Sequence, residues 1–304
     1  MYQVKRHSTS HFVPLRGHQY HVREWGNPQS TLPPVVLAHG WMDVAASWQF
    51  VVESLGEDFY QSRRILAADW RGYGLTIGPA ADSYWLPDYL GDLDALLRQL
   101  CPEQTIDLVG HSMGGNVVMM YAGARPDRIR RLVNLEGFGM SATRPAQAPG
   151  RLGQWLDEIH SLEKGEMDLK AYPDVAAVAQ RLMKTNKRLS QDKADWLAQH
   201  WAKPDAEGQW QILGDAAHKV INPYLYRVDE VLEIYKRIKA PTLVVEASDD
   251  SLSQWWQGKF TLEEFHERLK SVPDLKMATL QDAGHMLHHD QAEALARLLE
   301  DFLA

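Results

Sequence analysis

The 304-residue sequence contains a single cysteine, Cys101, so it cannot form an intrachain disulfide, and nothing in it requires an oxidising compartment. It also lacks any apolar run near the ~18 residues of a membrane-spanning helix. The polar, histidine-rich segment 1–21 has no apolar centre like that of a secretory signal. We therefore expect a cytoplasmic protein without a membrane span.

The sequence has fewer basic than acidic residues. Lys and Arg number 32 against 40 Asp and Glu, which gives a net charge of −8. A protein that coats DNA or RNA needs a basic face to displace counterions, so we expect no nucleic-acid partner. Hydrophobic residues make up 45% of the chain, which excludes a mainly disordered protein. No sequence pattern indicates an oligomeric state.

Short apolar runs separated by helical patterns predict the fold. The runs read as strands are 12–25 (two strands around Gly17), 33–38, 64–68, 105–109, 132–135, 241–245 and 275–280. Their lack of alternation indicates strands buried on both faces, as in a parallel sheet. Helical spacing of leucines and alanines marks 86–100 and 292–302. The alternation predicts an α/β fold with a mostly parallel, doubly wound sheet.

One connection is far longer than the others. About 100 residues separate the strand ending at Leu135 from the strand starting at Pro241, well beyond a normal crossover. We interpret residues 139–235 as an inserted helical cap, with residues 1–138 and 236–304 forming the core. The segment Gly137-Phe-Gly-Met-Ser-Ala142 has a dinucleotide-like glycine pattern, but prolines follow it, so we interpret it as a loop leading into the cap.

The strongest chemical signal is Gly110-His-Ser-Met-Gly114, which follows a predicted strand and opens a helical pattern. This is the context of a nucleophile elbow, in which a tight turn presents the serine above the sheet. A side chain at either glycine would collide with neighbouring backbone, and the serine backbone is strained. Ser112 is therefore our candidate nucleophile.

A serine hydroxyl needs a base to take its proton. We choose His285, because it follows the last strand and so lies at the same sheet edge as Ser112. We interpret the other histidines near the chain ends as surface residues; these are His7, His11, His18, His21, His288 and His289. None of them offers a recognised zinc spacing and H-E-x-x-H is absent, so we expect no metal and no cofactor.

A carboxylate should hold the imidazole in the right tautomer. Two positions compete at the carboxyl ends of strands, Asp250 and Glu136. We favour Asp250, because it gives the chain order Ser, Asp, His; Glu136 is the alternative acid. The backbone N–H groups of Trp41 and Met113 are our candidate donors to an oxyanion.

With these motifs the chain resembles the α/β-hydrolase family over nearly its whole length. The matching segments are His39-Gly-Trp41, Asp69-Trp-Arg-Gly-Tyr-Gly74, Gly110-His-Ser-Met-Gly-Gly115, Pro241-Thr-Leu-Val-Val245 and Gly284-His285. The resemblance implies an α/β-hydrolase fold and a catalytic triad. Haloalkane dehalogenases and epoxide hydrolases of this family use an aspartate nucleophile, so Ser112 argues against both activities.

Eleven tryptophans, six of them in or beside the proposed cap, predict an apolar pocket over Ser112. We therefore expect a serine hydrolase that cleaves esters or thioesters of a hydrophobic acyl or aromatic substrate. Two alternatives stay open. One is C–C bond hydrolysis or acyl transfer on the same triad, and the other is a ligand receptor without catalysis.

Overall fold

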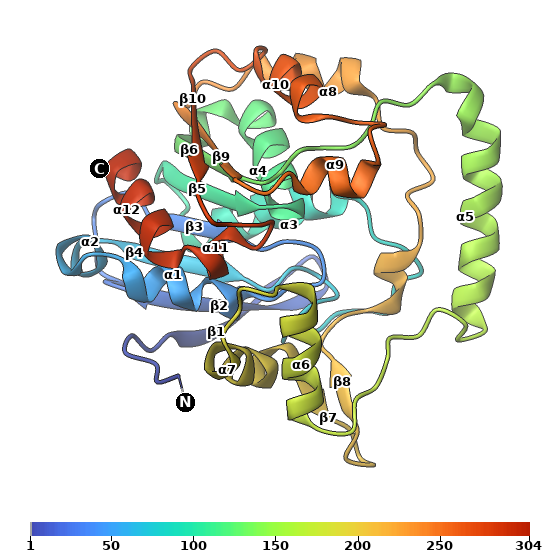
Figure 1. Ribbon diagram of the computed structural model, residues 1–304. Coiled ribbons are helices and arrows are strands. Elements are labelled where there is room, and N and C mark those ends of the chain that lie inside the picture. Colours follow the sequence, from blue (N-terminus) through green and yellow to red (C-terminus); the bar gives the residue numbers. More distant parts are fainter. Residues whose placement is uncertain (1) are drawn as a thin grey trace.

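The computed structural model describes residues 2–304. Its centre is an eight-stranded sheet in the order β1-β2-β4-β3-β5-β6-β9-β10 (Figure 1). These strands are β1 (Thr9–Leu15), β2 (His18–Gly26), β3 (Val35–Ala38), β4 (Arg64–Ala68), β5 (Ile106–His111), β6 (Ile129–Leu135), β9 (Thr242–Ala247) and β10 (Leu275–Leu280). β2 runs antiparallel to β1 and β4, and the other neighbours are parallel.

Helices cover both faces of this sheet (Figure 1). Those of the core are α1 (Gln49–Ser54), α2 (Glu57–Ser62), α3 (Leu86–Leu100), α4 (Met113–Ala124), α9 (Ser251–Trp256), α10 (Leu262–Leu269), α11 (Leu287–Asp290) and α12 (Ala292–Leu303). Two short 3-10 turns, η1 (Ala45–Trp48) and η2 (Pro126–Arg128), complete it. The fold expected from the sequence, an α/β fold with a mostly parallel sheet, is confirmed.

Strand side chains alternate between two hydrophobic cores, one on each face of the sheet. In β5, Leu108 packs with α3 and α4 on one face, while Val109 packs with α1 and α12 on the other. The central strands are buried on both faces for this reason. The expectation of burial on both faces is wrong for β10, because this edge strand exposes Lys276 and Met277.

The long insertion lies between β6 and β9. It contains η3 (Pro145–Gln147), α5 (Ala148–Glu163), α6 (Val175–Thr185), α7 (Gln191–Trp201), the hairpin β7 (Ala202–Pro204) and β8 (Trp210–Ile212), η4 (Ala216–Lys219) and α8 (Val228–Tyr235). Leu182 of α6 and Leu197 of α7 join the core beside α1 and α12, whereas α5 buries no residue and stands apart (Figure 1). The cap boundaries at 139 and 235 stay a prediction.

One aromatic stack holds the insertion to the core. The ring of His218, in η4, lies between the rings of Tyr73 and Tyr84, with both centroid distances 3.8 Å. Burial lowers the pKa of His218 to about 3, so the ring is neutral and stacks as an aromatic. None of the helices in the region 2–304 is long and apolar enough to cross a membrane.

Candidate active site

Ser112 occupies the turn between β5 and α4 in a strained conformation. Its φ is 54° and its ψ is −115°, a region that non-glycine residues rarely adopt. A Cβ on Gly110 would collide with the carbonyl of Gly114, and one on Gly114 would collide with the carbonyls of Ala38 and His39. The two glycines therefore permit the close approach of β5, α4 and β3 that forces the serine outward.

His285 lies directly over the serine. Its Nε2 is 2.9 Å from Ser112 Oγ, a hydrogen-bond distance. Its backbone carbonyl accepts a hydrogen bond of 2.7 Å from Nε2 of His111, and the ring of Trp255 packs edge-on against its imidazole at 4.2 Å. Burial lowers the pKa of His285 to about 3, so the resting imidazole is a neutral base.

The carboxylate that faces His285 is Glu136. Its Oε2 lies 3.3 Å from Nδ1 of His285, and its Oε1 accepts a hydrogen bond of 2.8 Å from the backbone N–H of Ala247. The residue directly follows β6 and has a positive φ of 55°, a conformation that non-glycine residues rarely adopt. Burial raises the pKa of Glu136 to about 8.

Asp250, favoured from the sequence as the acid, has another contact. Its Oδ1 accepts a hydrogen bond of 2.9 Å from the backbone N–H of Ser253, so it caps the N-terminus of α9. The neighbouring Asp249 pairs with Arg188 at 2.7 Å. The placement expected for Asp250 is therefore corrected, and the alternative carboxylate, Glu136, occupies that place. The helix-cap pattern Asp-Ser-Leu-Ser253 is the sequence signal for this outcome.

The candidate oxyanion donors lie beside the serine. The first intrahelical bond of α4 runs from Asn116 N–H to Ser112 C=O, so the N–H of Met113 belongs to the first helical turn, where amides have no intrahelical acceptor. On the other side, Gly40 packs so closely that a Cβ there would sit 3.2 Å from the Ser112 Cβ. The Trp41 amide follows in the same turn, and Trp41 as a whole residue is 52% exposed.

A cavity of about 550 Å³ opens over Ser112 and His285. Apolar side chains, including Trp41, Trp201 and Trp255, line part of it. Charged side chains line another part; the cations, all from the insertion, are Arg181, Lys184, Lys187 and Arg188, and the carboxylates are Asp43, Asp249 and Asp290. The lining is therefore mixed, whereas the sequence predicted an apolar pocket from the tryptophans alone. Most of those tryptophans pack elsewhere; Trp196, for example, contacts Phe50.

Several histidines interpreted from the sequence as surface residues are buried. His288 and His289 are 1% and 4% exposed, and both contact the hydroxyl of Ser47. His18 and His21 are 8% and 0% exposed, and His21 bonds to the carboxylate of Asp69. His7 and His11 are exposed, as expected. The short helix α11 packs against α1 and η1, and this tertiary contact left no periodic signal in the sequence.

Comparison with known proteins agrees with the fold. A sequence profile described as alpha/beta hydrolase fold matches residues 33–292. The serine hydrolase-like protein of Danio rerio is 26% identical, over 99% of this chain and 90% of its own length. The 2-hydroxy-6-oxo-2,4-heptadienoate hydrolase of Pseudomonas putida is 24% identical, over 89% of each chain.

Solved structures give the same result. A thioesterase domain from the curacin biosynthetic pathway superposes with a TM-score of 0.79 and 25% identity, covering 97% of this chain and 99% of its own. A hypothetical protein from Pseudomonas aeruginosa reaches a TM-score of 0.81 with 26% identity, covering 97% of this chain and 98% of its own. The profile spans most of the sequence and the architecture agrees with it, so the chain belongs to the alpha/beta hydrolase fold family.

Proposed function

We propose that this chain is a serine hydrolase that cleaves carboxylic esters or thioesters through an acyl-enzyme. The observation that carries the proposal is the 2.9 Å contact between Ser112 Oγ and His285 Nε2, at the mouth of a cavity. A hydroxyl held at this distance from a neutral imidazole can lose its proton as it attacks a carbonyl.

Each neighbouring group has a role in this mechanism. Glu136 accepts the Nδ1 proton of His285, which leaves Nε2 free to act as the base, and its charge stabilises the imidazolium that forms. The N–H groups of Trp41 and Met113 donate to the oxyanion of the tetrahedral intermediate. His285 then protonates the leaving alcohol or thiol, and the acyl group stays on Ser112.

Deacylation repeats these steps with water. His285 takes a proton from a water molecule, which attacks the acyl carbonyl, and the serine leaves with that proton as the carboxylic acid is released. No cofactor takes part in either half of the reaction. Glu136, and not Asp250, is the acid of the proposed triad, because Asp250 caps α9.

The cavity lining supports a substrate class. The tryptophans suit an apolar acyl or aryl group next to the scissile carbonyl. The exposed cations Arg181, Lys184 and Lys187, which line the cavity, suit a negative charge at the far end of the substrate. We propose an ester or thioester that carries both features.

The test is covalent labelling by a fluorophosphonate followed by peptide mass spectrometry. The expected result is a single adduct on Ser112, together with turnover of p-nitrophenyl esters. A Ser112→Ala variant is the matched control and should lose both the label and the turnover. Wild-type protein without label, or a variant with full activity, would overturn the proposal.

C–C bond hydrolysis is the second candidate. Two observations favour it. The named relatives include the 2-hydroxy-6-oxo-2,4-heptadienoate hydrolase of Pseudomonas putida, whose substrate is a carboxylate, and exposed cations of the insertion line the present cavity. A vinylogous 2-hydroxy-6-oxodienoate substrate assayed beside the ester panel separates the two reactions. The one with the higher kcat/KM is the better description.

A further inference from the structure

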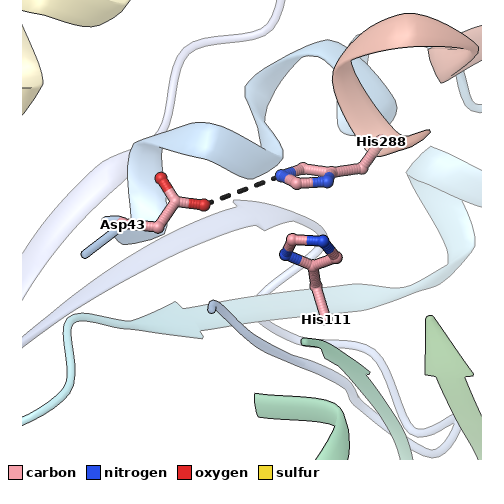
Figure 2. Close-up of side chains that lie close together, drawn as sticks. All are labelled: Asp43, His111 and His288. Atoms are coloured by element: carbon pink, nitrogen blue, oxygen red, sulfur yellow. Dashed lines mark ion pairs between the residues drawn. The ribbon is translucent and has the colours of Figure 1, made fainter. Parts of the chain in front are cut away.

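Figure 2 shows three buried polar side chains that lie close together next to the turn that carries Ser112. Asp43, His111 and His288 come from three distant segments: the loop after β3, the end of β5 and the helix α11. The three residues are at most 4% exposed, and each offers one atom within 4.8 Å of the other two. The three residues are far apart in the sequence and meet only in the folded chain, so they match no zinc-binding spacing motif.

Two atoms of the cluster have lone pairs without donors. Asp43 Oδ1 accepts a hydrogen bond of 2.9 Å from the N–H of Val44, but Asp43 Oδ2 has no hydrogen-bond partner within residues 2–304. His111 Nε2 donates to the carbonyl of His285, so the ring hydrogen lies there and Nδ1 carries a lone pair. Nδ1 also lacks a partner over the described part of the chain. Buried acceptors without donors are rare, because each costs about 1–3 kcal/mol.

We propose that Asp43, His111 and His288 form a binding site for a divalent transition metal, best matched by Zn²⁺. Imidazole nitrogen and carboxylate oxygen are its usual donors besides thiolate. Asp43 Oδ2 and His288 Nε2 lie 3.7 Å apart, which suits two ligands at about 2.0–2.2 Å from one ion. Two ligands of a tetrahedral ion lie about 3.4 Å apart, so the widest separation in the cluster, within 4.8 Å, requires side chains to close by up to about 1.4 Å.

The surroundings of the cluster fit a metal site. Histidine ligands usually donate their second ring N–H to a carbonyl or carboxylate, as His111 does to His285. Asp43 and His111 also line the active-site cavity, so an ion has a path of entry, and a fourth ligand can be a water from the cavity.

Occupation of this site would slow hydrolysis, an effect that rests on the proposed function. His285 must become an imidazolium during acyl transfer, and its ring centroid lies 4.8 Å from that of His111. A dication held by Asp43 and His111 repels that imidazolium, so the transition state becomes less stable.

The experiment titrates Zn²⁺ into the full chain by competition with a fluorescent chelator. We expect one ion per chain, and about 10–100-fold weaker binding in His288→Gln and in Asp43→Asn. His266→Gln is the control, because His266 bonds to Glu246 at the protein surface and should not affect the affinity. Equal affinity in all three variants, or no binding by the wild type, overturns the proposal.

Further measurements distinguish a failure of the metal site from a failure of folding or of the proposed function. Co²⁺ bound to the wild-type chain should give the intense visible absorption of a four-coordinate ion, which requires no variant. Ser112→Ala should keep its zinc affinity, whereas a tenfold loss would place the ion on the serine and His285 instead. In the wild type, saturating Zn²⁺ should lower kcat for p-nitrophenyl acetate, and fluorophosphonate labelling without zinc tests hydrolysis independently.

Discussion

The Oε2 atom of Glu136 lies 3.3 Å from Nδ1 of His285, although 149 positions separate the two residues in the sequence. The backbone of β9 fixes this geometry. Val245 C=O accepts from the Glu136 N–H, and the Ala247 N–H donates to the second carboxylate oxygen. The carboxylate is thus held from two sides and has little freedom to leave the imidazole.

Replacement of this carboxylate should nearly abolish catalysis. Glu136→Gln keeps the size of the side chain, but its amide N–H₂ favours the wrong histidine tautomer, so we expect kcat to fall by about 10⁴-fold. Asp250→Asn is the matched control. Asparagine caps helices as well as aspartate does, so this variant should keep its activity within a fewfold and its stability. Steady-state kinetics on one p-nitrophenyl ester measures both, and the reverse order of effects would restore Asp250 as the acid.

The same carboxyl predicts an alkaline pH optimum. Burial raises the pKa of Glu136 to about 8, so below that pH the carboxyl binds a proton. A protonated carboxyl donates to Nδ1 of His285, which leaves the ring hydrogen on Nε2, where it blocks proton transfer from Ser112. We expect kcat/KM for a neutral ester to fall about tenfold per pH unit below about pH 8. A flat profile between pH 6 and 9 would contradict this reasoning.

The free energy of unfolding should decrease with rising pH, whereas kcat/KM should increase. Because the folded pKa of Glu136 is about 8 against an ordinary value of 4.5, the native state binds a proton that the unfolded chain releases. The free energy of unfolding therefore falls as pH rises between these values. Glu136→Gln carries no such charge, so its Tm should exceed that of the wild type increasingly from pH 4.5 to pH 8. Differential scanning calorimetry of both proteins across this pH range measures the difference, and a Tm offset that does not change with pH would contradict the prediction.

Much of the fold could be predicted from the sequence, because its signals are local. The apolar runs at β3, β4 and β5 and the glycines around Ser112 report steric and burial requirements of their own positions. Local sequence signals could not decide whether Glu136 or Asp250 faces His285. Both follow neighbouring strands, β6 and β9, and only the positive φ of Glu136 and the cap made by Asp250 decide which side chain meets His285.

The strain at Ser112 can be measured with two variants that both lack the hydroxyl. Ser112→Ala keeps the constraint at φ 54°, whereas Ser112→Gly removes the Cβ that makes this backbone costly. We expect both to be inactive and the glycine variant to be more stable than the alanine variant by about 1 kcal/mol. Equal midpoints in urea unfolding would show that the elbow stores no strain.

The exposed lysines that line the cavity predict discrimination between substrates by charge. Lys184 and Lys187 are exposed at the cavity, so the double change to glutamine should raise KM severalfold for an ester with a terminal carboxylate. The KM for a neutral ester of similar size should stay unchanged. Added salt should weaken the preference of the wild type in the same way. Equal losses for both esters would mean that the lysines support the cap rather than bind charge.

Because α5 packs on so little of the rest of the molecule, it is a suitable site for labels and insertions. A 16-residue helix without a buried residue gains little from packing, so it opens at a small free energy while the central sheet stays closed. Its amide hydrogens should exchange with deuterium long before those of α4, and proteases should nick it first. Ala148–Glu163 is therefore the place where a fluorophore, an affinity tag or an inserted domain would disturb Ser112 least.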